Sequence, residues 1–223
     1  MSVFVSESPA REAAAAFATL CEESIACLNL AVSGGSTPRA LFRLLATEFR
    51  EHIPWQRVAV FQVDERCVPP TDSQSNWKML HEELLAHVPN LTAFRMEAER
   101  PRAAEDYERV IRDNAPANEV GVPRFDLILL GMGADGHTAS LFPGTDALSE
   151  ERRLVVLNAV PQLSTERITM TYPLINAAAR RWFLVQGADK APAYARIHSH
   201  GDVPAALVAD ADWFVDASVV GAK

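Results

Sequence analysis

Short apolar runs alternate with segments of helical periodicity along most of this chain. Runs such as Asp126-Leu-Ile-Leu-Leu130 and Val58-Ala-Val-Phe61 are nearly continuous, which is typical of strands buried on both faces of a sheet. Parallel strands of this kind are covered by helices on each side. The pattern therefore predicts an α/β fold with a doubly wound, mostly parallel, Rossmann-like sheet and helices on both faces.

Capping and turn signals set the expected bounds of the elements. Ser8 is the expected N-cap of the first helix, with Pro9 at its first position. The expected helices span residues 9–27, 38–49, 76–88, 102–114, 173–179 and 188–198. The expected strands span residues 27–32, 58–63, 125–130, 154–159, 167–171 and 182–186, with a further short strand at 206–208. No low-complexity linker or internal repeat interrupts this order, so residues 1–223 are expected to form a single domain.

The amino-acid composition argues against several classes of binding partner. The 223 residues carry a formal net charge of −8 and no run of Lys or Arg, which argues against nucleic acid and anionic membranes as partners. No stretch approaches the roughly 18 apolar residues of a membrane span, and the N-terminal residues lack the pattern of a signal peptide. Cys21, Cys27 and Cys67 form no CxxC pair, so neither a disulfide framework nor a thiolate metal site is indicated. We expect a cytoplasmic protein that is a monomer or weak homodimer and holds no metal.

A glycine-rich turn follows the strand at 27–32. In Ser33-Gly34-Gly35-Ser36-Thr37-Pro38, two glycines allow close approach of a ligand, and Ser36 or Thr37 can cap a helix that has Pro38 at its first position. Free N–H groups and the positive helix end suit a phosphate. The alternative is a tight turn with an ordinary cap. The spacing is not that of a Walker A loop, and proline stands where the nucleophile elbow of serine hydrolases needs glycine.

A second glycine-rich loop follows the strand at 125–130. Gly131-Met-Gly133-Ala-Asp135-Gly136-His137 satisfies GxGxxG, but Pro143-Gly144 interrupts the long helix that a dinucleotide site requires. The favoured interpretation is a loop that presents Asp135 and His137 at the ligand edge of the sheet. Histidine can act there as a general base, with a carboxylate that orients its ring.

Charged residues mark a third strand end. Asp64-Glu65-Arg66 follows the strand at 58–63, and these charges can either bind a polar substrate or form an ion pair with a neighbouring helix. Arg167 opens an expected strand, and Lys190 lies near the start of an expected helix. Both can reach the same edge of the sheet, although surface cations are most often only solvated.

Together these segments resemble the family of glucosamine-6-phosphate isomerases and 6-phosphogluconolactonases. The matching segments are AVSGGSTPRALFRLL, VFQVDERCVPPTDSQSNWKML, FDLILLGMGADGHTASLFPGT and RITMTYPLINAAARRWFLVQGADKA. They occur in the family's order from about residue 31 to residue 191. The resemblance implies a fold of the sugar-phosphate isomerase type and hydrolysis of 6-phospho-D-glucono-1,5-lactone to 6-phosphogluconate in the oxidative pentose phosphate pathway. It also implies that no metal or organic cofactor is needed.

The resemblance further implies roles for individual residues. His137 matches the histidine that activates water, with Asp135 close to it and Arg66 as a candidate for stabilising the oxyanion. Asp64 and Asn76 match residues that line the same pocket. The residues that match the phosphate site are Gly34, Gly35, Ser36, Thr37, Arg167 and Lys190.

The deaminase branch of the same family is the nearest alternative. Its DGHxAFNEP motif has a glutamate at the position of Phe142, and an aromatic side chain cannot move protons. Deaminases typically have Asp-Glu-Tyr where this chain has Asp64-Glu65-Arg66. A non-catalytic sugar-phosphate sensor is a third possibility, but it is expected to lack His137 or to carry an added DNA-binding module. Gln62 departs from the lactonase pattern, in which many members have an aromatic residue, and this affects only the expected local packing.

Overall fold

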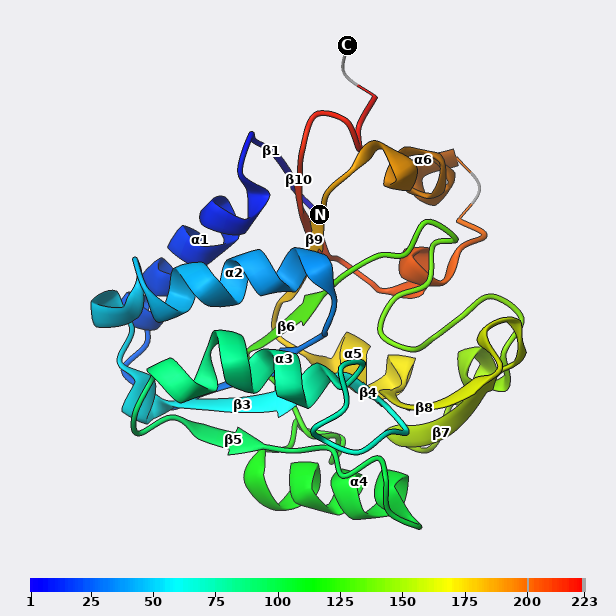
Figure 1. Ribbon diagram of the computed structural model, residues 1–223, viewed down its shortest axis with the longest axis horizontal. Helices are drawn as coiled ribbons and strands as arrows, with labels where there is room; N and C mark the ends of the chain where they lie inside the picture. The colour runs from blue at the N-terminus through cyan, green and yellow to red at the C-terminus, as the bar shows by residue number, and fades with distance from the viewer. Residues whose placement is uncertain (200, 222–223) are drawn as a thin grey trace.

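A parallel sheet forms the centre of the computed structural model, which describes residues 1–199 and 201–221 (Figure 1). Its seven strands, in spatial order, are β1 (Val3–Val5), β10 (Asp212–Val215), β9 (Arg181–Val185), β6 (Leu127–Leu130), β2 (Leu28–Val32), β3 (Val58–Gln62) and β5 (Thr92–Phe94). All neighbouring strands run parallel. The predicted doubly wound, mostly parallel α/β fold is confirmed.

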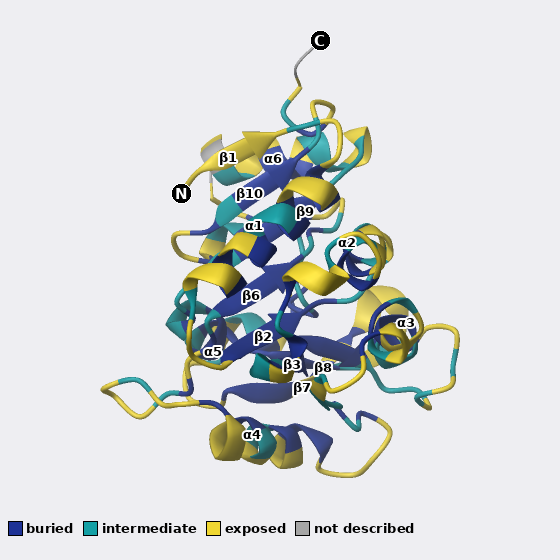
Figure 2. Cartoon of the chain, turned by 90° about the vertical axis from the view of Figure 1, so that its left-hand side faces the viewer, coloured by how far each residue is buried: buried dark blue, intermediate teal, exposed yellow. Residues whose placement is uncertain are grey.

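Helices cover both faces of this sheet. The helices are α1 (Pro9–Glu23), α2 (Ser36–Ala46), α3 (Asn76–Glu83), α4 (Ala103–Asn114), α5 (Tyr172–Ala177) and α6 (Ala191–Ser199). Leu30 and Val32 of β2 join the apolar cluster under α1, α2 and α3, whereas Ala31 joins the cluster of the opposite face. This period of two buries the central strands on both sides, as the dark blue strands in Figure 2 show.

A second, antiparallel sheet lies beyond the carboxyl end of β3. It consists of β4 (Asp64–Arg66), β8 (Thr165–Met170) and β7 (Val155–Val160), in that order. The expected strands at 154–159 and 167–171 exist, but they belong to this sheet and not to the parallel one. The alternation of buried and exposed residues in β7 is typical of an antiparallel sheet with one covered face.

Several expected bounds were wrong. Residues 204–207 form a 3₁₀ turn, Pro204–Leu207, and not a strand. The first helix ends at Glu23 and not at residue 27, because the chain becomes extended at Ser24. Of the strands, β1, β4, β5 and β10 were missed, since each has only three or four residues.

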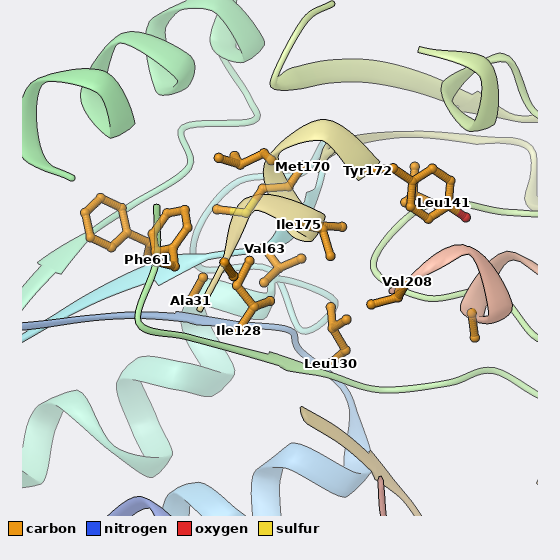
Figure 3. Packing of buried hydrophobic residues seen from close by; sticks show 14 of the residues in the cluster. Ala31, Phe61, Val63, Ile128, Leu130, Leu141, Met170, Tyr172, Ile175 and Val208 are labelled. Carbon is orange, nitrogen blue, oxygen red and sulfur yellow. The ribbon is translucent and has the colours of Figure 1, made fainter. Parts of the chain in front are cut away.

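A buried cluster joins the two sheets. Figure 3 shows Ile128 and Leu130 of β6 close to Val63, with Met170 of β8 and Ile175 of α5 packed beside them. Val63 also donates its N–H to the carbonyl of β2 residue 32 (2.9 Å) and accepts from the N–H of Met170 (2.9 Å). The loops at this end of the parallel sheet therefore rest on a buried apolar base.

Candidate active site

A pocket of about 210 Å³ lies at the carboxyl ends of β2, β3 and β6. All the site residues expected from the sequence line it except Asp135 and Arg167. The lining residues are Ser33, Gly34, Gly35, Ser36, Thr37, Pro38, Asp64, Arg66, Asn76, Gly131, Met132, Gly133, His137, Ala139 and Lys190. A larger hollow of about 770 Å³ lies between α4 and the second sheet, but its lining includes no histidine.

The turn after β2 brings backbone close to the pocket. A Cβ at Gly34 would lie 1.9 Å from Oδ1 of Asn76, so only glycine fits there. Gly35 has a φ of 118° and is the N-cap of α2, which begins at Ser36. The expectation that Ser36 or Thr37 caps the helix was therefore wrong, because both lie in its first turn. The positive end of α2 borders the pocket, as an anion site requires.

The loop after β6 fixes His137. Its Nδ1 lies 2.6 Å from Oδ1 of Asp135, which also accepts the backbone N–H of His137 (3.1 Å). Partial burial works against ionisation of Asp135, but the hydrogen bonds from His137 outweigh it and lower the pKa of the carboxyl. The imidazole also stacks on Phe142, with ring centroids 4.0 Å apart. Because a carboxylate accepts from Nδ1–H, the neutral ring presents Nε2 as a free proton acceptor.

Asp64 and Asn76 form a polar wall of the pocket. Oδ2 of Asp64 accepts a 2.6 Å hydrogen bond from Ser140, and its carbonyl accepts from Nδ2 of Asn76 (2.9 Å). The latter bond leaves Oδ1 of Asn76 buried and without a hydrogen-bond partner among the described residues. An unused acceptor at the pocket is suited to a hydroxyl of a bound ligand.

Two arginines lie side by side at the edge of the pocket. Arg66 of β4 and Arg167 of β8 are directly opposite each other, and Nε of each is buried without a partner in the described part of the chain. Burial, together with the neighbouring Arg66, lowers the pKa of Arg167. Arg167 is the third residue of β8 and not, as expected, the first of a strand. Lys190 reaches the pocket from another side and pairs with Asp189 at 2.8 Å.

Paired guanidinium groups are suited to a bound anion. Two adjacent cations repel each other, and an anion between them removes this cost. Their unpaired donors match the fixed oxygen geometry of a phosphate. Two contacts near the pocket were not predicted, because they join residues remote in sequence: Ser140 donates to Asp64, and the backbone N–H of Asn76 donates to Glu65.

No group of three or more His, Cys, Asp or Glu side chains within residues 1–199 and 201–221 is arranged to hold a metal ion. None of the described helices is long and apolar enough to cross a membrane.

The fold and the pocket define a parallel α/β protein whose pocket is lined by a glycine turn and basic side chains beside a His–Asp pair. Residues 5–215 match the family model described as glucosamine-6-phosphate isomerases/6-phosphogluconolactonase, and the chain belongs to this family. The predicted resemblance is confirmed.

Relatives and solved structures agree with this assignment. The 6-phosphogluconolactonase of Treponema pallidum is 44% identical over 183 residues, which cover 79% of this chain and 76% of that protein. The chloroplastic 6-phosphogluconolactonase 3 of Arabidopsis thaliana is 38% identical over 212 residues, covering 88% of this chain and 65% of that longer protein. The solved structure of 6-phosphogluconolactonase from Trypanosoma brucei has a TM-score of 0.88 at 27% identity, covering 99% of this chain and 97% of that chain.

Proposed function

We propose that this chain is a 6-phosphogluconolactonase that hydrolyses 6-phospho-D-glucono-1,5-lactone to 6-phospho-D-gluconate, with His137 as general base. Family membership and the relatives named 6-phosphogluconolactonase support the reaction. The assignment of the base rests on the contact of Asp135 with Nδ1 of His137. His137 lines the same pocket as Arg66, whose Nε has no partner among the described residues.

The phosphate is proposed to bind between the turn that begins α2 and the basic side chains. Gly34, Gly35, Ser36 and Thr37 offer backbone and hydroxyl donors, while Arg167 and Lys190 offer positive charge. Asp64 and Asn76 then face the sugar hydroxyls. This anchoring holds C1 of the lactone near His137, and such positioning removes much of the entropic barrier of a reaction with water.

In the proposed reaction Nε2 of His137 takes a proton from a water molecule whose oxygen attacks C1. The C1 carbonyl oxygen becomes an oxyanion, stabilised by the Arg66 guanidinium or by N–H groups of a glycine turn. The intermediate collapses when the bond between C1 and the ring oxygen breaks. The ring oxygen then receives the proton from His137. Asp135 stabilises the charged imidazole during this cycle.

The proposed reaction requires only a modest rate enhancement over spontaneous hydrolysis. Activated lactones hydrolyse unaided in water, so the enzyme needs less help than an amidase. A positioned general base contributes about 10²- to 10⁴-fold, and with substrate positioning this suffices without a covalent step.

A sugar-phosphate enzyme of the glucosamine-6-phosphate deaminase/isomerase type is the second candidate, because the family that matches this chain also includes glucosamine-6-phosphate isomerases. Phe142 argues against it, since this ring packs on His137 at the position of the deaminase glutamate. The lactonase proposal therefore accounts better for the residues present.

We also propose a cytoplasmic setting. Cys21, Cys27 and Cys67 are all free thiols, which is the usual state in a reducing compartment.

Two substrates test the proposed reaction directly. The lactone is generated in situ and its loss is compared with the spontaneous rate in buffer, in parallel with ammonia release from glucosamine 6-phosphate. We expect rapid lactone loss and no ammonia. A folded protein that leaves the lactone at its spontaneous rate would disprove the lactonase assignment, and ammonia release would favour the deaminase.

A further inference from the structure

Glu65 is a buried carboxylate directly behind the pocket. Only 2% of the residue is exposed, and its neighbours Asp64 and Arg66 both line the pocket. Successive residues of a strand point to opposite faces, so Glu65 of β4 points away from the ligand side. It has no place in the proposed chemistry, and its role must lie in what it contacts.

Five hydrogen bonds satisfy this carboxylate. Its Oε1 accepts the backbone N–H groups of Arg66 (2.8 Å) and Asn76 (2.7 Å). Its Oε2 accepts from Trp77 N (2.7 Å), Gln62 Nε2 (2.9 Å) and Ser75 Oγ (3.0 Å). Among the described residues it forms no ion pair, so the expected alternative of an ion pair with a neighbouring helix was wrong. Dipoles at the start of α3 take the place of a cation, since the first N–H groups of a helix have no partner within it.

These bonds join two of the elements that line the pocket, β4 and α3. The backbone N–H groups of Arg66 and Asn76 donate to the same oxygen atom of Glu65. Asn76 in turn contacts Gly34 and the carbonyl of Asp64. A shift of the Glu65 carboxylate therefore moves an anion-binding residue and a hydroxyl-binding residue together.

Glu65 also provides negative charge beside the arginine pair. Burial and the neighbouring Arg66 lower the pKa of Arg167, whereas the carboxylates of Asp64 and Glu65 act in the opposite direction. Gln62, the departure from the family pattern, takes part in this arrangement: it donates to Glu65 and accepts the N–H of Met96 (2.8 Å).

We propose that Glu65 is a positioning residue that sets the relative placement of Arg66 and Asn76 and thereby the affinity of the pocket for an anion. Its effect on lactone turnover rests on the proposed function, whereas its effect on anion binding does not.

The variant Glu65→Gln tests this role because it preserves shape but not hydrogen bonding. A carboxylate accepts at both oxygens, whereas an amide accepts at one and donates at the other. In either amide orientation at least two of the facing donors lose their acceptor. We expect the rise in melting temperature caused by inorganic phosphate to fall by at least half, and kcat/KM for the lactone to fall about 10- to 100-fold, since a misplacement of about 1 Å costs on this order.

Glu108→Gln is the matched control. Glu108 of α4 likewise accepts backbone N–H groups of another segment, at Leu154 (2.9 Å) and Val155 (3.3 Å), and it does not line the pocket. This variant should have a lower melting temperature, but the rise in melting temperature caused by phosphate and the kinetic constants should be unchanged. A merely structural role for Glu65 predicts the same result for both variants, and that outcome would overturn the proposal.

Gln62→Leu covers the case in which Glu65→Gln does not fold. Gln62 does not line the pocket, and its replacement removes one of the five groups that donate to Glu65. The phosphate effect and kcat/KM should therefore fall as expected for Glu65→Gln, but by a smaller factor. Unchanged values would again overturn the proposal. If the unaltered protein binds phosphate but does not hydrolyse the lactone, the proposed function fails while the phosphate comparison still decides the role of Glu65. If it binds no phosphate, the positioning proposal is wrong.

Discussion

Gly133→Ala should displace His137 without disturbing the rest of the fold. A Cβ at Gly133 would lie 2.1 Å from Nδ1 and 2.2 Å from Cε1 of His137, and 2.6 Å from Oδ1 of Asp135. Gly133 is not among the residues with left-handed backbone, so alanine suits its φ and the conflict is purely steric. The ring must move by about 1.3 Å, the difference between 2.1 Å and the 3.4 Å at which ordinary contact begins.

The expected loss follows from this displacement. A shift of about 1 Å in a reacting group costs on the order of 10²-fold in rate, and complete loss of a general base costs up to about 10⁴-fold. We therefore expect kcat/KM for the lactone to fall about 10²- to 10⁴-fold. Overpacking should also reduce the free energy of unfolding by about 1–3 kcal/mol.

The measurement combines lactone kinetics with thermal unfolding. Gly131→Ala serves as the control for the fold of the loop, because its Cβ would meet no atom within 4 Å. Its melting temperature should match that of the unaltered protein. If Gly133→Ala is folded and retains kcat/KM within about threefold of the original value, the position of His137 does not control the reaction and the reasoning is refuted.

Three further changes test separate parts of the site and the fold. Arg167→Ala removes one of the paired guanidinium groups, so KM for the lactone should rise at least about tenfold with little change in kcat; an unchanged KM would remove Arg167 from the phosphate site. Phe142→Leu removes the ring stacked on His137, so kcat should fall about tenfold with an unchanged phosphate effect on the melting temperature; an equal loss of both would indicate general damage to the pocket. Hydrogen bonds from the N–H groups of Arg153 and Arg152, and from the Arg153 side chain, lower the pKa of Glu150 from its usual 4.5 to about 2. Its charged form therefore stabilises the fold fully above pH 4.5, and this contribution is lost as the pH falls toward 2. In denaturant titrations the free energy of unfolding of Glu150→Gln should fall less at acid pH than that of the unaltered protein. The same pH profile for both proteins would contradict this.

The parts of the site that are local in sequence could be predicted. The glycines at 34 and 35 and the loop from Gly131 to His137 identified two pocket walls, because glycine and histidine have few ordinary uses at the end of a buried strand. The alternation of apolar runs and helical segments was enough to predict the central strands of the parallel sheet, β9, β6, β2 and β3.

The parts that depend on distant pairing could not be predicted. The hydrogen bond between Ser140 and Asp64 joins residues 76 positions apart, and no local sequence pattern indicates it. The same holds for the second sheet, in which β8 pairs with the three residues of β4, about 100 positions earlier in the chain, and β7 pairs with β8. Short strands carry too few residues to show a period.

The most direct test of the central claim is the rate of lactone loss in three parallel reactions: buffer, the protein with a chelator, and His137→Ala with its fold verified by thermal unfolding. We expect rapid, chelator-resistant hydrolysis that falls to near the buffer rate in the variant. A folded His137→Ala protein that hydrolyses the lactone as fast as the original would contradict the assignment of His137 as the general base.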